Sequence, residues 1–488
     1  MEGRIETSSV DGYAADSRTG TIRRPRHCMT LRTSIEKPII GVVGFNLFTL
    51  LVFATAPVQW DTPNLAKLYL YVCLCQLLIL IGFQLGHRKG LQEDATRLLT
   101  LSSGDKLTNR LFTFYICTFV VGYAYRMDLS PLDIGGMFSR LLGGVIDRRF
   151  GYTTALDHPY YGGPVRWIVY FAISIFNQLF FAVGFVQWRR LTATRKLLFA
   201  ILVCLELFYW VGRGTAFGVV AMATTFWFSS MLWVRRSDHR SISASLGRFL
   251  LVFLLFLGAV AFFSHNLYSR SDYLERRPER YEFGKSPVNS DAIVFSIVPE
   301  SLQSTYMNVV SYFGQGYYHT CLAFDLDFKS TWFLGSNPAL ISLAAVVGID
   351  VWDDTYMHRL FQIDGIDEFG LWHSAYTWFA SDVSFYGVPF VLTSIAYLFG
   401  FSWAKSVRGD FLSKIVFIVL GNVLLFLFAN NSYLSSVFYS FMFVFPFWLY
   451  TRVWRFSRAA RPSRRLTLTG AAIPGSCTGL ETARHDVL

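Results

Sequence analysis

The chain has 488 residues, of which 53% are hydrophobic, 17% are aromatic and only 16% are charged. This composition excludes an ordinary soluble domain, in which about a quarter of the residues carry a charge. Apolar runs approaching twenty residues recur along the chain, so we predict an all-α polytopic membrane protein, and we attribute the net charge of +11 to membrane topology rather than to nucleic acid.

Hydropathy predicts about ten transmembrane helices, because a helix satisfies its own backbone hydrogen bonds in lipid. The predicted spans are residues 38–58, 65–86, 111–125, 165–187, 197–212, 215–233, 249–265, 384–404, 412–429 and 433–451. The chain then divides into a basic tail (1–37), helices one to seven (38–265), a large loop (266–383), helices eight to ten (384–453) and a disordered basic tail (454–488).

Lysine and arginine set the expected orientation, because they accumulate in short cytoplasmic loops. The two tails and the loops on the same side of the membrane hold 30 of the 44 basic residues, which places both termini in the cytoplasm. No apolar segment of a cleaved signal peptide precedes the first span, so the first helix is expected to act as a signal anchor.

Two longer segments fall outside the membrane. Residues 126–164 contain "FSRLLGGVIDRRFG", in which Phe138, Leu141, Leu142 and Val145 are spaced as on a short amphipathic helix. The 266–383 loop is long enough to have a structure of its own. Its segments 301–328 and 339–362 are expected to form helices against the membrane or on the bundle, and the second could re-enter the membrane.

The stretch "WHSAYTWFASDVSFYG" enters the eighth span. A helical step places six of its residues on one face: His373, Tyr376, Thr377, Ala380, Ser381 and Ser384. Such a strip predicts the lining of a wet cavity. In the alternative interpretation the hydroxyls bond to carbonyls one turn back and His373 lies at the membrane interface. Asp382 is half a turn out of phase with His373, so it is expected to pair with another helix.

A second candidate is Arg213 in "YWVGRGTAF", between two spans that almost touch. A guanidinium there either snorkels to the membrane surface or binds an anion such as phosphate, for which its planar donors are suited. Glu206 lies seven residues earlier and could hold Arg213 in place.

The third candidate region is "YSRSDYLERRPERYEFGK", residues 268–285, a mixture of charges and tyrosines. It is typical of a solvated surface, but Arg270, Arg277 and Arg280 could also bind a sugar or phosphate group. Arg359 is another basic candidate on the same side. Neither the acidic segment "DVWDDTYMH" nor the cysteines have a spacing diagnostic of a metal site, and no disulfide framework is expected.

The stretch from His373 to Gly387 resembles the motif of the bacterial O-antigen polymerase and ligase superfamily. In that motif a His-(Asn/Ser) pair is followed by an aromatic or aliphatic helix, an acid and a glycine; here these are His373-Ser374, Tyr376, Asp382 and Gly387. Ser384 stands where a first glycine is common. The helix layout, the large late loop and the arginine in "GRG" are also similar to this superfamily, most of all to its repeat-unit polymerases.

The resemblance implies an enzyme of the bacterial inner membrane that acts on the periplasmic side without cofactor or metal. It would join oligosaccharide repeat units carried on undecaprenyl diphosphate into O-antigen or exopolysaccharide. His373 would be the general base with Asp382 in reserve, and Arg213 would stabilise the leaving diphosphate. The implied substrate-binding residues are Arg270, Arg277, Arg280, Arg359, Tyr376, Thr377, Ser381 and Glu206. A chain-length regulator and a flippase are candidate partners, besides membrane lipids.

Other functions remain open from the sequence, among them a passive receptor or scaffold, because nothing in the sequence proves turnover. An O-antigen ligase would transfer the finished glycan to the lipid A core. A transporter or flippase of lipid-linked sugars would need charged sites near mid-bilayer, and Glu206 is the one clear acid within a predicted span. A glycosyltransferase with paired carboxylates in the first outside loop is disfavoured, because "QWDTPN" offers only Asp61.

Overall fold

The structure is a computed structural model. It describes residues 37–92, 101–127, 129–130, 132–146, 173, 176, 179–213, 217–233, 286–289, 291–366, 373–429 and 444–450. Within these ranges the secondary structure is helical without a β-strand, apart from an isolated bridge between Val58 and Val288. The predicted all-α class is therefore confirmed.

Seven helices coincide with predicted spans. They are α1 (Lys37–Ala54), α2 (Leu65–Gln92), α3 (Leu101–Arg126), α7 (Ala193–Gly212), α8 (Phe217–Trp233), α14 (Ala375–Val407) and α15 (Phe411–Leu425). Among the described residues, α2 and α14 are long and apolar enough to cross a membrane. The predicted spans 165–187 and 433–451 lie partly, and 249–265 entirely, outside the described residues.

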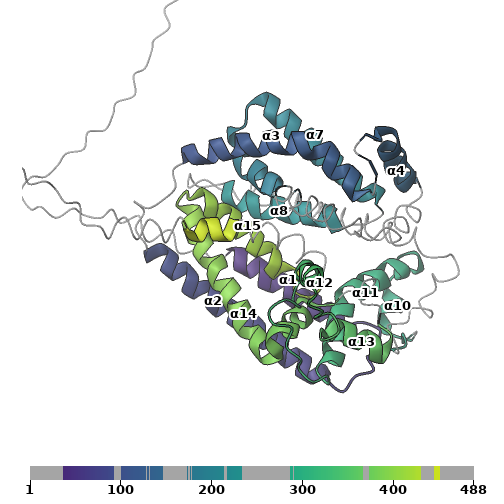
Figure 1. The fold of residues 1–488 in the computed structure, drawn as a ribbon. Helices are drawn as coiled ribbons and strands as arrows, with labels where there is room; N and C mark the ends of the chain where they lie inside the picture. Colours follow the sequence, from purple (N-terminus) through teal and green to yellow (C-terminus); the bar gives the residue numbers. More distant parts are fainter. Residues whose placement is uncertain are drawn as a thin grey trace, which may run out of the picture.

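Helices α2 and α14 form the most extensive helix pair (Figure 1). Glycines on α2 recur every four residues, and a Cβ at Gly82 would lie 2.4 Å from the Thr393 carbonyl oxygen. A Cβ at Gly86 would lie 1.8 Å from the Tyr397 carbonyl oxygen, so side chains larger than hydrogen are excluded. The contacts advance by four residues on both helices, so the helices run parallel, as the predicted topology requires for these two spans.

Helix α14 contains a break where the sequence predicted the start of a span. Ser384 has φ 59° and ψ 166°, which is not a helical conformation. The remaining part, residues 385–407, is about 34 Å long at 1.5 Å per residue, which matches a bilayer core of about 30 Å. The residues before Ser384 form a separate helical segment that points in its own direction, so Ser384 does not continue the predicted polar face.

The 266–383 region contributes α10 (Ile293–Ile297), α11 (Glu300–Ala323), α12 (Pro338–Val346) and α13 (Tyr356–Asp364). Helix α11 packs against α1, α2 and α14, so the first predicted loop segment lies on the bundle. The second segment is not one helix: residues 347–355 separate α12 from α13, with Gly348 at φ 81°.

The remaining helices form a second group above the α2–α14 pair in Figure 1. There α3 and α7 meet through Tyr123, Glu206 and Tyr209. Helix α4 (Ile134–Ile146) packs on α7, and α8 contacts both α7 and α15. The amphipathic helix predicted at 138–145 is confirmed as α4, but it packs through Met137 and Gly144, while Phe138 and Leu142 are exposed. The short 3₁₀ helix η3 (Trp188–Arg190) precedes α7.

Candidate functional site

The structure pairs His373 with a second histidine, His319. His373 lies just before α14, and its ring centroid is 4.7 Å from that of His319 on α11, with the planes inclined by 41°. His373 is fully buried and His319 is 4% exposed. Two imidazoles that are 54 positions apart in the chain thus meet inside the protein, where α11 packs on the N-terminal end of α14.

Hydroxyl groups connect the residues next to the two histidines. The Thr320 hydroxyl lies 2.6 Å from that of Ser374 and 3.0 Å from that of Thr377, and it donates to the Gly316 carbonyl. Ser374 also begins α14, because its hydroxyl accepts a hydrogen bond from the Thr377 backbone N–H. The hydroxyls and the cap hold the two histidine-bearing segments together.

Gly316 allows this close approach. A Cβ at position 316 would lie 2.0 Å from the Phe428 carbonyl oxygen and 3.1 Å from the Ser374 backbone nitrogen. The segment after α15 is held at the same place, because the Ala375 N–H donates to the Leu427 carbonyl. The end of α15, the middle of α11 and the start of α14 therefore meet beside the histidine pair.

The His373 ring is neutral around pH 7. Burial lowers its pKa well below the usual histidine value, and the nearby His319 lowers the pKa further. Within the described part of the chain, neither His373 ring nitrogen has a hydrogen-bond partner. An unpaired buried polar group costs about 1–3 kcal/mol, which makes it a candidate for a functional group. A neutral imidazole can accept a proton.

The predicted polar strip is present, but it does not face water. His373, Tyr376, Thr377 and Ser381 have no exposed surface in this structure. The Tyr376 hydroxyl accepts a hydrogen bond from Gln76 on α2. The expectation of a wet lining is thus not met here, because α2, α11 and α13 cover the strip and supply its polar partners.

Ser381 connects the strip to α13 and to the helix backbone. Its hydroxyl accepts from the Tyr356 N–H at 3.2 Å and donates to the Thr377 carbonyl at 3.3 Å. The second bond joins the hydroxyl to the carbonyl four residues earlier in the same helix, as expected in the alternative interpretation of the sequence.

Asp382 binds a loop rather than another helix. One carboxylate oxygen accepts from the Thr331 hydroxyl at 2.5 Å and from the Gly335 N–H at 2.8 Å. The other accepts from the Ser336 N–H at 2.9 Å. With its carboxylate occupied by three donors, Asp382 has a structural role in this conformation.

Arg213 lies in the other helix group, on the C-terminal end of α7. Its guanidinium donates to the Tyr209 hydroxyl at 3.4 Å and is 5.8 Å from the centre of the Trp210 ring. Tyr209 belongs to an apolar cluster with residues of α3 and α4, whereas Tyr376 belongs to the cluster of α1, α2, α11, α14 and α15. Figure 1 shows α7 and α11 well apart. The structure therefore does not bring Arg213 to His373.

Glu206 is held by aromatic donors. It accepts from the Tyr123 hydroxyl at 2.9 Å, the Tyr115 hydroxyl at 3.4 Å and the Trp210 ring N–H at 2.9 Å. It is 5% exposed. Trp210 contacts both residues, because its ring N–H donates to Glu206 and its ring lies against the guanidinium of Arg213.

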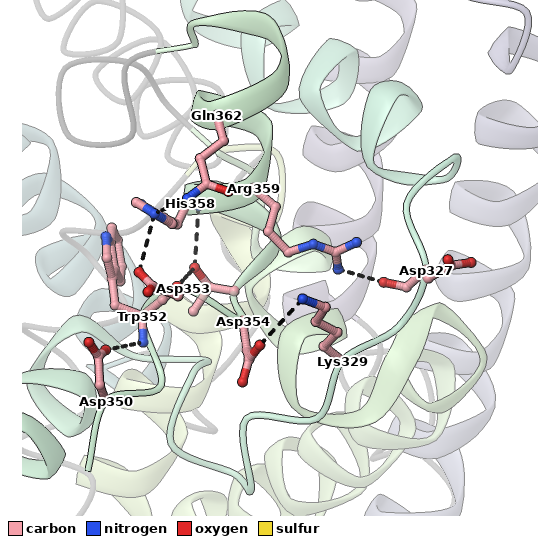
Figure 2. A network of polar contacts seen from close by, with 10 residues as sticks. Asp327, Lys329, Asp350, Trp352, Asp353, Asp354, His358, Arg359 and Gln362 are labelled. Carbon is pink, nitrogen blue, oxygen red and sulfur yellow. Dashed lines mark hydrogen bonds and ion pairs between the residues drawn. The ribbon is translucent and has the colours of Figure 1, made fainter.

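Arg359 lies in the polar network shown in Figure 2. Its guanidinium donates to the Asp327 carbonyl at 2.5 Å and lies 5.7 Å from the centre of the Tyr356 ring. The network also contains the ion pair Lys329–Asp354, at 3.8 Å, and a contact of 3.2 Å between the His358 ring and the Asp353 carboxylate. No group of three or more metal-ligating side chains occurs among the described residues.

The other three arginine candidates, Arg270, Arg277 and Arg280, lie outside the described residues. His319 is the residue that sequence reasoning did not select for the site. A signal was available, because His319-Thr320 and His373-Ser374 are both histidine–hydroxyl dipeptides. Comparisons with protein-family models, with curated proteins and with solved structures find no match.

Proposed function

We propose that this chain is a multi-pass inner-membrane glycosyltransferase that polymerises undecaprenyl-diphosphate-linked repeat units on the periplasmic side. The observation that carries the proposal is the buried His319–His373 pair, in which His373 is neutral and has unoccupied ring nitrogens. Its place at the start of a membrane-spanning helix suits a substrate whose sugar is in water and whose lipid is in the bilayer.

In the proposed reaction the acceptor sugar hydroxyl attacks the anomeric carbon of the donor glycan. The new C–O bond forms as the bond from the anomeric carbon to the diphosphate breaks, and the lipid diphosphate leaves with the electron pair. His373 accepts the hydroxyl proton, a contribution of roughly 10²- to 10⁴-fold for a well-placed general base. Both imidazoles are covered in this structure, so the covering segments must move before transfer.

The departing diphosphate needs a cation, and we assign that role to Arg359 rather than Arg213. Helix α13, which carries Arg359, packs against both α11 and α14, the two elements that form the histidine pair. Preorganised positive charge stabilises the charge that develops on the leaving group. The backbone carbonyl that now accepts from Arg359 is an exchangeable partner, because a phosphate oxygen can replace it.

A complementation experiment tests the assignment. His373→Ala and Arg359→Ala should insert at the wild-type level but abolish long glycan chains on a gel. The control is His358→Ala. His358 lies next to Arg359 on α13 and contacts Asp353, and its removal should leave the ladder intact. Normal ladders from His373→Ala would overturn the catalytic role.

A second experiment separates polymerase from ligase. Loss of a polymerase leaves single lipid-linked repeat units, whereas loss of a ligase leaves long chains that are not attached to the lipid A core. Analysis of the lipid-linked glycans in a deletion strain therefore decides between the two transfers.

A further inference from the structure

The loop of residues 331–336, hereafter the aromatic loop, exposes two large side chains. Trp332 is 77% exposed and Phe333 is 71% exposed. Both have positive φ angles, 55° and 63°, a region that residues with a Cβ rarely occupy. Backbone strain of this kind costs on the order of 1–3 kcal/mol per residue and persists only where the surroundings impose it.

Asp382 imposes this conformation from the inside. Its carboxylate accepts from the Thr331 hydroxyl and from the N–H groups of Gly335 and Ser336, so both ends of the aromatic loop are bound to one side chain. Thr331 is fully buried, and its backbone N–H donates to the Ser381 carbonyl. The loop is therefore rigid at its base, while its two aromatic side chains point away from the protein.

The attachment point sets the depth of the loop relative to the membrane. Ser381 and Asp382 precede Phe385, where the membrane-length part of α14 begins, by three to four residues, so they lie within roughly 6 Å of that point whatever the direction of the segment before the break. The headgroup layer outside the hydrocarbon core is roughly 5–8 Å thick on each side. The base of the aromatic loop thus lies at headgroup depth, where tryptophan is enriched in membrane proteins.

Cationic groups accompany the aromatic side chains. Lys329 is 56% exposed, and Arg359 binds the Asp327 carbonyl in the segment that leads into the loop (Figure 2). Lys329 is paired with Asp354, and Asp353 is exposed in the same network, so it is the amphipathic aromatic rings rather than a net positive charge that match the boundary of headgroups and acyl chains.

We propose that the aromatic loop is a preformed interfacial wedge, in which Trp332 and Phe333 insert into the headgroup region of the outer leaflet. The partner is the lipid bilayer itself. Because Asp382 shapes the loop before contact, insertion does not carry the cost of ordering a flexible segment. This role is independent of the proposed glycosyl transfer and holds for any activity of the chain.

The test uses the whole protein in phosphatidylcholine nanodiscs, with and without bromine on the acyl chains near the headgroup. The emission of wild type minus that of Trp332→Phe reports this one indole. We expect the difference emission to be quenched by brominated lipid and protected from aqueous iodide. Trp378→Phe is the matched control, since Trp378 is 1% exposed and its difference emission should be quenched less by brominated lipid.

Difference emission that is quenched by iodide and insensitive to bromine would overturn the proposal, and would indicate a loop that contacts water, a glycan or another protein. A second variant, Asp382→Asn, tests the origin of the rigidity. Its amide replaces one acceptor oxygen by a donor opposite the loop donors, so the bromine quenching of Trp332 should weaken. Unchanged quenching would show that Asp382 does not hold the aromatic loop in this conformation.

Discussion

At the residue scale, the neutral state of His373 depends on its surroundings rather than on a hydrogen bond. Burial and the neighbouring His319 both disfavour a positive charge, so the pKa of His373 is well below its ordinary value. A base of this kind stays deprotonated at pH values where an exposed histidine is already protonated. The ring is thus free of a proton near neutral pH, although the same surroundings make it a weaker base than an exposed histidine.

Replacing His319 by Gln should raise the pKa of His373, because one of the two causes of its depression is removed. The acid limb of the pH profile for chain elongation should then move to higher pH. The measurement is elongation in proteoliposomes as a function of pH, compared with the same profile for His358→Gln. An unchanged limb would show that the His373 ring does not control the profile.

Stability should depend on pH through the same residue. The unfolded chain binds a proton at His373 near pH 6.5, whereas the folded chain does so only at lower pH. The contribution is therefore fully present above about pH 6.5 and is lost as the pH falls through the folded pKa. Melting temperatures in detergent from pH 8 to 5 should fall more for wild type than for His373→Asn.

Asp382 illustrates a second residue-scale effect, the cost of unpaired donors. Asp382→Ala would leave the buried Gly335 N–H without its acceptor and would release Thr331 and Ser336. We expect a loss of about 3 kcal/mol in unfolding free energy, the range for removing hydrogen bonds to a charged group. Chemical denaturation in detergent measures this, with Asp353→Ala, at a 72% exposed position, as the control. Equal stability of the two variants would contradict the structural role.

At the element scale, the pairing of α2 with α14 depends on glycines. Small residues every four positions let two membrane helices approach closely enough for van der Waals contact along their length. Gly86 and Gly400 lie on opposite sides of this contact, each against a backbone carbonyl of the partner helix. Arg408, just beyond α14, donates to the Gly90 carbonyl at 3.2 Å and so fastens the C-terminal ends of the two helices together.

Gly86→Leu should separate the two helices, because even a Cβ at this position would overlap the Tyr397 carbonyl. We expect a large loss of folded protein, measured by size-exclusion chromatography and thermal stability in detergent. The matched control is Gly44→Ala on α1, where an added Cβ meets no atom within 4 Å. That variant should be neutral or slightly stabilising, since alanine favours a helix by about 1 kcal/mol over glycine.

At the scale of the whole molecule, the polar residues that the sequence suggested for one site lie in two separate groups of helices. Glu206 and Arg213 belong to the group of α3, α4 and α7, and His373 to the group around α2 and α14. Helix α8 contacts α7 on one side and α15 on the other, so it connects the groups. The proton acceptor and the diphosphate-binding arginine that we propose therefore belong to the same helix group.

The predicted orientation can be checked by cysteine labelling in a cysteine-free background. Asp353→Cys lies in the large loop and should react with an impermeant maleimide in intact cells with a permeable outer membrane. Val407→Cys, at the end of α14, is 44% exposed and should react only after the inner membrane is opened. The opposite pattern would invert the topology and move the histidine pair to the cytoplasmic side.

The amino-acid sequence by itself determined the helical class and the positions of the seven helices that coincide with predicted spans. These properties are local, since they follow from the hydropathy of consecutive residues. Only the tertiary structure decided that His319 meets His373, that Asp382 binds the aromatic loop, and that Arg213 lies in another helix group. Such pairings depend on how helices distant in the chain pack together, and packing depends on the fit between whole surfaces, including glycines such as Gly316 and Gly86.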